Sequence, residues 1–159
     1  MTEARVADAL EREHREIDAG LEEFRRGLTE GETRGGTLRA ASRALRRHIF
    51  IEEELLFPPL RDAGLVGPVT VMLMEHAEIW STLDELERLI DSGSDPQAIE
   101  QPLASLSQVL EEHNIKEERI LYPQADATAG AEVTSKVLAQ LADGELPPGW
   151  VCQRLANNG

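Results

Sequence analysis

A segment that occurs twice without a gap constrains this chain more than any other feature of its sequence. The first copy runs from His48 to Pro58 and reads HIFIEEELLFP, and the second runs from His113 to Pro123 and reads HNIKEERILYP. A shorter pair repeats as well, EHREI at 13–17 and EHAEI at 75–79. Because the polar residues are copied as faithfully as the apolar ones, the duplication indicates a shared site rather than shared packing alone.

The spacing inside each copy has a physical meaning. Residues four positions apart on an α-helix lie on one face, one above the other. His48 and Glu52 therefore point the same way, as do His113 and Glu117. An imidazole and a carboxylate on one helical face can hold one metal ion or bridge two.

Apolar residues recur at steps of three and four along four segments, which is the pattern of amphipathic helices. The expected helices cover about 3–28, 37–58, 67–92 and 95–123. Pro58 and Pro123 are expected to end the second and the fourth, since proline lacks the N–H that continues a helix. A weaker fifth helix is expected at 128–142, followed by a last turn with Trp150, Cys152 and Leu155.

These helices predict an all-α fold, an antiparallel up-down four-helix bundle with a short C-terminal helical extension. Aromatic residues make up only 4% of the chain, so the core must consist mainly of aliphatic residues, which favours helix over strand. Short loops make consecutive helices antiparallel neighbours. We expect residues 1–125 to form the bundle and residues 126–159 to pack on it as an extension without chemistry of its own.

Each of the four long helices places one histidine in its apolar stripe, and two of them also place a glutamate there. Counted from the helix ends at about 1.5 Å per residue, these positions differ in height by only a few ångströms. We therefore expect six side chains to meet in one layer: His14, His48, Glu52, His76, His113 and Glu117.

Two buried carboxylates need compensation, because an unpaired buried charge costs several kcal/mol. No Lys or Arg lies in the four stripes to pair with Glu52 or Glu117. A dinuclear metal centre removes the difficulty and is favoured over a metal-free polar core. Other glutamates fall off the stripes and are expected on a solvated face, although one of the second group could orient a ligand histidine. The first group is Glu53, Glu54 and Glu118, and the second is Glu13, Glu16, Glu75 and Glu78.

Charge and composition narrow the possible partners and the location. A net charge of −14 argues against nucleic acid and anionic membrane surfaces as partners. The single cysteine, Cys152, excludes an intrachain disulfide and a cysteine-based metal site. No apolar stretch is long enough to span a bilayer, and the charged N-terminus shows no signal-peptide pattern. The expectation is a soluble cytoplasmic protein.

The two H-x-x-x-E-E segments ending in L-[FY]-P, each preceded by a helix with an E-H pair, resemble the hemerythrin-like, or HHE cation-binding, family. The resemblance covers about residues 8–125. It implies a four-helix bundle with a non-haem centre of two Fe ions, with Mn or Zn as possible alternatives. Carried over by position, it implies His14 and His48 on one iron, His76 and His113 on the other, and Glu52 and Glu117 as bridges.

The chain departs from the oxygen-carrying members of that family. They have a further histidine one turn after the position of His76, where this chain has Trp80. They also commonly use an aspartate five residues after the last histidine, whereas this chain has Glu117, four residues after His113. These departures argue against reversible O₂ carriage and leave open positions on each iron. Trp80 is either a wall of the ligand pocket or a packing residue.

The resemblance implies a protein that binds iron and interacts with O₂, peroxide or a similar small ligand. Two alternatives stay open: an enzyme that consumes peroxide, as catalases and peroxidases do, and an iron or oxygen sensor or store without turnover. A structural zinc site is a third. A ferritin-like site fits less well, because its ligand motif is Glu-x-x-His rather than His-x-x-x-Glu.

Overall fold

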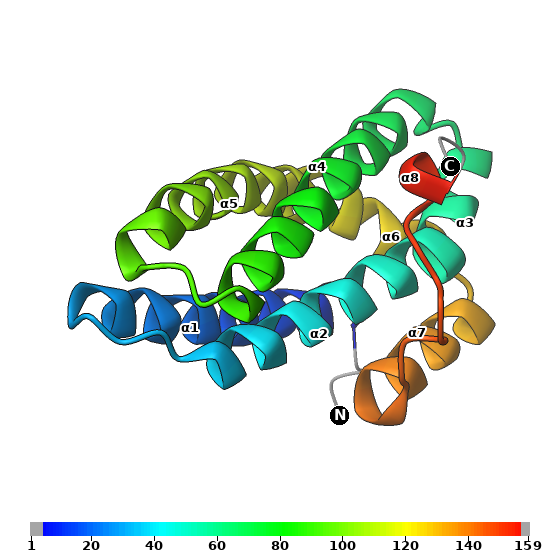
Figure 1. The fold of residues 1–159 in the computed structure, drawn as a ribbon. Coiled ribbons are helices and arrows are strands. Elements are labelled where there is room, and N and C mark those ends of the chain that lie inside the picture. Colours follow the sequence, from blue (N-terminus) through cyan, green and yellow to red (C-terminus); the bar gives the residue numbers. More distant parts are fainter. Residues whose placement is uncertain (1–4, 157–159) are drawn as a thin grey trace.

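The computed structural model describes residues 5–156, and every regular element within this range is helical (Figure 1). Four helices are long: α1 (Val6–Thr29), α2 (Gly35–Ile51), α4 (Val66–Asp91) and α5 (Pro96–Lys116). Four are short: α3 (Phe57–Asp62), α6 (Tyr122–Thr128), α7 (Ala131–Asp143) and α8 (Gln153–Ala156). Two π-helical segments complete the chain, η1 (Glu52–Leu56) and η2 (Glu117–Leu121).

The long helices pack side by side, and each has two of the others as neighbours. Helix α1 packs against α2 and α5, and α4 packs against the same two helices. Helix α7 lies across α1, α2 and η1, and α8 packs on α4, so the C-terminal segment contacts both halves of the repeat (Figure 1). No helix among the described residues combines the length and the apolarity needed to cross a membrane.

The helix ends follow local chemistry. Gly31 follows the last turn of α1 and Gly93 that of α4, and both have a positive φ, of 79° and 69°. Glycine adopts this left-handed conformation without a steric penalty, so it ends the helix and turns the chain back. Helix α5 begins at Pro96 as expected, but it continues through Pro102, held by the buried side chains of Ile99 and Leu103.

The expectation that Pro58 and Pro123 end their helices is wrong. In each copy of the repeat a π-helical segment precedes the proline, and the helix continues afterwards as α3 or α6. Each proline lies in the first turn of that new helix, where the missing N–H is not needed. The backbone N–H of Phe57 donates to the carbonyl oxygen of Glu52, and that of Tyr122 donates to the carbonyl oxygen of Glu117. These hydrogen bonds occupy equivalent positions in the two copies, so the duplication includes the π-helical turn.

Two hydrophobic clusters fill the interior, one at each end of the long helices. Along α1, Leu10 belongs to one cluster and Ile17 to the other, and His14 lies between them. In α4 the change of cluster falls around His76, and after His48 and His113 it comes at Ile51 and at Leu121 of η2. The four histidines therefore occupy a polar layer between two apolar regions.

Candidate metal centre

The structure brings together all six residues that the sequence singles out. They form two groups that share both glutamates, and within each group one ligand atom per residue lies within 4.8 Å of all the others. The first group is His14, His48, Glu52 and Glu117, and the second is Glu52, His76, His113 and Glu117. All six side chains are buried. The two groups overlap through the two common carboxylates, and each of them could hold a metal ion.

Each histidine is held by its own carboxylate through Nδ1. Nδ1 of His14 lies 3.1 Å from Glu118 and that of His48 lies 2.9 Å from Glu13. In the other half, Nδ1 of His76 lies 2.7 Å from Glu53, and the His113–Glu75 distance is 2.9 Å. Because a carboxylate only accepts, Nδ1–H must donate in all four pairs. This fixes the ring orientation and turns every Nε2 inward.

The Nε2 atoms meet each other and the two central carboxylates. Nε2 of His14 lies 3.0 Å from that of His48 and 3.2 Å from Glu117. Nε2 of His76 lies 3.1 Å from Glu52 Oε1, and that of His113 lies 3.3 Å from Glu117 Oε2. Four imidazole nitrogens and two carboxylates thus surround one small volume, the mixed nitrogen and oxygen donor set that suits iron, manganese or zinc.

Unpaired polar atoms at the centre test whether the donor set fits a metal. Within the described part of the chain, the buried side-chain atoms without a hydrogen-bond partner are Arg47 Nε, outside the cluster, and three central atoms, Glu52 Oε1, His76 Nε2 and Glu117 Oε2. A buried polar atom without a partner costs free energy, and native proteins rarely leave one. All three belong to the six clustered side chains and point into the cluster. A bound cation would satisfy them, so the residues fit a metal.

The carboxylates also control the charge of the histidines in the metal-free protein. Burial alone would lower the histidine pKa values, but Glu52 and Glu13 raise the pKa of His48 well above its usual value. Glu117 and Glu75 likewise outweigh burial and raise the pKa of His113 to about 10. His48 and His113 therefore hold a proton in the metal-free protein near neutral pH, and metal binding at these residues displaces it.

Glu117 shows the reciprocal effect. Burial alone would raise the pKa of this carboxyl, but His113 and the hydrogen bonds around it hold the pKa well below the usual range. The carboxylate is thus ionised and available as a ligand across the physiological pH range.

Tyr122 is a central residue that sequence reasoning missed. Its side chain is fully buried, and its hydroxyl donates to Glu52 Oε2 at 2.7 Å. The Tyr122 hydroxyl oxygen also lies 3.0 Å from His14 Nε2 and 3.1 Å from His48 Nε2. The repeat offered a signal for this role. Tyr122 aligns with Phe57, so the two copies differ at this aromatic position by the hydroxyl that only Tyr122 has. Phe57 instead stacks on His76, with ring centroids 5.5 Å apart.

The predicted solvated face is wrong for Glu53, which is 1% exposed and holds His76. The π-helical turn of η1 changes the helical phase after Glu52, so two consecutive glutamates face inward. Glu118 is half-buried and holds His14. One upstream glutamate was expected to orient a ligand histidine. In the structure two do so, since Glu13 accepts from His48 and Glu75 accepts from His113.

Trp80 lies in the hydrophobic cluster that contains Ile17. The guanidinium of Arg46 lies 4.5 Å from the centre of its ring, and the ring of Trp150 packs edge-on at 5.6 Å. These contacts favour the packing interpretation of Trp80.

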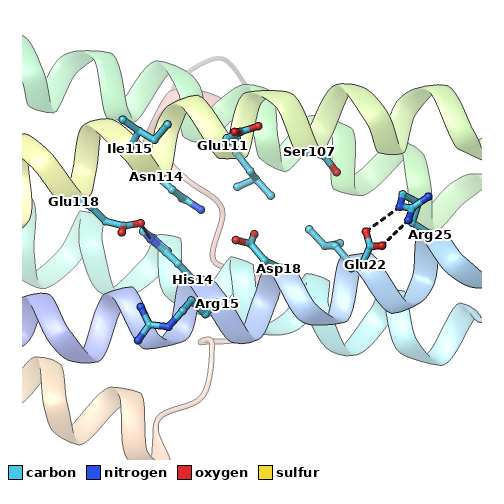
Figure 2. Close-up of a pocket in the computed structure, with 12 residues that line it drawn as sticks. His14, Arg15, Asp18, Glu22, Arg25, Ser107, Glu111, Asn114, Ile115 and Glu118 are labelled. Carbon is cyan, nitrogen blue, oxygen red and sulfur yellow. Dashed lines mark hydrogen bonds and ion pairs between the residues drawn. The ribbon is translucent and has the colours of Figure 1, made fainter.

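A groove of about 520 Å³ between α1 and α5 has His14 in its wall (Figure 2). Asp18 lies along the α1 side, and Asn114 points into the groove from α5. Glu118 reaches from the groove to His14, so a surface carboxylate and a site histidine are in direct contact (Figure 2). The groove thus reaches the edge of the site at His14.

Comparison with known proteins agrees with this geometry. The model of the hemerythrin HHE cation-binding domain matches residues 5–125, so the chain belongs to this family. No curated protein and no solved structure gave a significant match. The matched region contains all six clustered residues and ends before α7.

Proposed function

We propose that the protein binds two iron ions in a non-haem di-iron centre and that this centre interacts with O₂ or with reactive oxygen species such as peroxide. His14 and His48 hold one ion, His76 and His113 hold the other, and Glu52 and Glu117 bridge the two. The observation that carries the proposal is the convergence of four Nε2 atoms whose Nδ1 atoms are all fixed by carboxylates.

The protein part of this centre supplies about four ligands to each ion, two histidines and two shared carboxylates. Iron commonly accepts about six ligands, so positions for a small ligand are left. When bound, iron supplies the redox and oxygen chemistry that side chains lack. The groove beside His14 supports access of O₂ or peroxide to these positions.

Peroxide turnover is the second candidate function, and Tyr122 favours it. Its buried hydroxyl donates to Glu52 and lies within 3.1 Å of His14, His48 and Glu117, so it holds a proton within the site. A proton held at this point can assist breakage of an O–O bond in a bound ligand. A sensor or store would not need such a donor. Steady consumption of peroxide separates the two functions.

The proposed fold is the antiparallel up-down four-helix bundle that the family resemblance implies. The order of the two hydrophobic clusters reverses from each long helix to the next, as expected for an antiparallel up-down four-helix bundle. Of the two expected units, the described residues 5–125 then form the metal-binding unit. The described residues 126–156 form a helical extension packed on it, through α7 and α8. The cytoplasm, where iron is available and Cys152 stays reduced, is the proposed location.

Metal analysis combined with an optical spectrum tests the function. Protein purified from iron-replete cells should contain two iron ions per chain, and His48→Ala should lose much of that iron. The exposed Glu132 provides a control, since Glu132→Gln on α7 should keep it. One tightly held ion that His48→Ala does not affect would refute the dinuclear site.

A further inference from the structure

The C-terminal segment, residues 144–156, lies outside the family match and yet contacts the side chains that hold two of the histidines. We infer that this segment is a positioning element of the metal centre, acting on His76 through Glu53 and on His48 through Arg47 and Glu13. The inference rests on the proposed metal site and adds to it a control by residues that the family pattern does not include.

The first connection runs through Glu53. Its Oε1 accepts the backbone N–H of Gln153 at 2.9 Å, and its Oε2 accepts Nδ1–H of His76 at 2.7 Å. One buried carboxylate is thus shared between the C-terminal backbone and a ligand histidine. A donor on Oε1 withdraws charge from the carboxylate, so Glu53 accepts less strongly from His76.

The second connection runs through Arg47. Its Nη1 donates to the carbonyl oxygen of Gly144 at 3.2 Å, and its Nη2 donates to Glu13 Oε2 at 2.7 Å. The other oxygen of Glu13 accepts Nδ1–H of His48 at 2.9 Å. His48 belongs to one ligand group and His76 to the other, so the segment reaches both halves of the centre.

Packing fixes the segment at this position. The indole of Trp150 donates to Glu54 at 3.0 Å, and its ring packs edge-on against Phe50 and Trp80. The neighbouring Cys152 is completely buried. The backbone N–H of Gln153 is therefore held against Glu53 by the contacts of Trp150 and Cys152 just before it.

The hydrogen bond from Gln153 should affect the reduction potential of the metal centre in a definite direction. A histidine whose Nδ1–H is bonded to a stronger acceptor becomes a stronger donor through Nε2. A stronger donor favours the more oxidised metal and lowers the reduction potential. Loss of the Gln153 N–H should therefore lower the potential of the iron centre, and a weaker acceptor in place of Glu53 should raise it.

Gln153→Pro removes the backbone N–H that donates to Glu53 and leaves the Glu53 carboxylate in place. Gln153 is the first residue of α8, a position that proline accepts. Gln153→Ala is the matched control, because it keeps the N–H. In the iron-loaded full-length protein, Gln153→Pro should lower the midpoint potential relative to wild type, and Gln153→Ala should not.

Glu53→Gln tests the same connection from the other side. The neutral amide is a weaker acceptor, so this variant should raise the midpoint potential. It should also weaken Co²⁺ binding, measured by competition with a chelator, by roughly 10- to 100-fold. Loosened packing alone would not move the potential in opposite directions in the two variants.

A midpoint potential for Gln153→Pro that equals or exceeds that of Gln153→Ala would overturn the inference, as would a fall in Glu53→Gln. Either result in a wild type that holds two ions leaves the proposed function intact. A wild-type protein that binds neither iron nor Co²⁺ would refute the proposed function itself.

Discussion

Removal of the Tyr122 hydroxyl should destabilise the metal-free protein more than the metal-loaded one. Tyr122→Phe keeps the ring, which is fully buried, and reproduces the residue that the first copy of the repeat has at this position, Phe57. The variant loses the O–H that donates to Glu52 at 2.7 Å. In the metal-free protein this donor is one of the few groups that compensate the Glu52 carboxylate.

The magnitude follows from that one bond. A single O–H donates to one acceptor at a time, and the shortest contact is the one to Glu52. A hydrogen bond to a charged group contributes about 1.5–3 kcal/mol. For a chain of this size, such a loss lowers the melting temperature by roughly 3–12 °C. Bound cations compensate the same carboxylate, so the loss should be smaller in the metal-loaded protein.

Thermal unfolding followed by circular dichroism, with and without metal, measures both values. Ser42→Ala is a suitable control, because Ser42 is also buried but accepts its hydrogen bond from Arg46 in the α2 region away from the cluster. It should shift both forms equally. Equal losses for Tyr122→Phe in the two forms, or none in the metal-free form, would contradict the assigned role.

Four further predictions concern ligation, proton displacement, pH-dependent stability and metal removal. Glu52→Gln should weaken binding of both ions by more than the roughly 10- to 100-fold typical of residues that only hold a ligand, because Glu52 belongs to both groups; chelator competition that shows loss of one ion alone would argue against a bridge. Apparent metal affinity should rise with pH between about 6.5 and 10, since the raised pKa of His113 keeps a proton on the metal-free site; a flat profile would exclude proton displacement. The stability of the metal-free fold should fall at high pH, because the raised pKa of His113 contributes stability that is full below about pH 6.5 and lost as the pH rises through about 10. It should also fall at low pH, because the lowered pKa of Glu117 contributes stability that is lost as the pH falls below about 4.5. Melting temperatures measured across this pH range check both losses. Chelation should lower the melting temperature while far-ultraviolet circular dichroism stays helical, because both hydrophobic clusters persist; loss of helix would mean that metal is required for folding.

The sequence was sufficient to predict the helices and the six clustered residues, because both are periodic. His48 and Glu52 sit four residues apart in a regular helix, and the repeat doubles that pattern. Glu53 could not be placed, since its burial depends on a π-helical turn that no apolar period reveals. Tyr122 was visible only as a difference between the copies, and its importance depends on residues of α1, α2, η1 and η2 that meet at its hydroxyl.

The continuation of the chain through Pro58 and Pro123 was missed for the same local reason. Proline usually ends a helix because the preceding carbonyl and ring collide. The wide turns of η1 and η2 avoid this and let a new helix begin at the proline. The connection of residues 144–156 to the histidines lies even further from sequence reasoning, because it passes through the backbone N–H of Gln153.

Anomalous X-ray diffraction at the iron absorption edge, from crystals of the iron-loaded protein, tests the dinuclear centre most directly. Two peaks are predicted in each chain, one next to His14 and His48 and the other next to His76 and His113, with Glu52 and Glu117 in contact with both. A single peak, or a peak away from the four Nε2 atoms, would contradict a shared di-iron site.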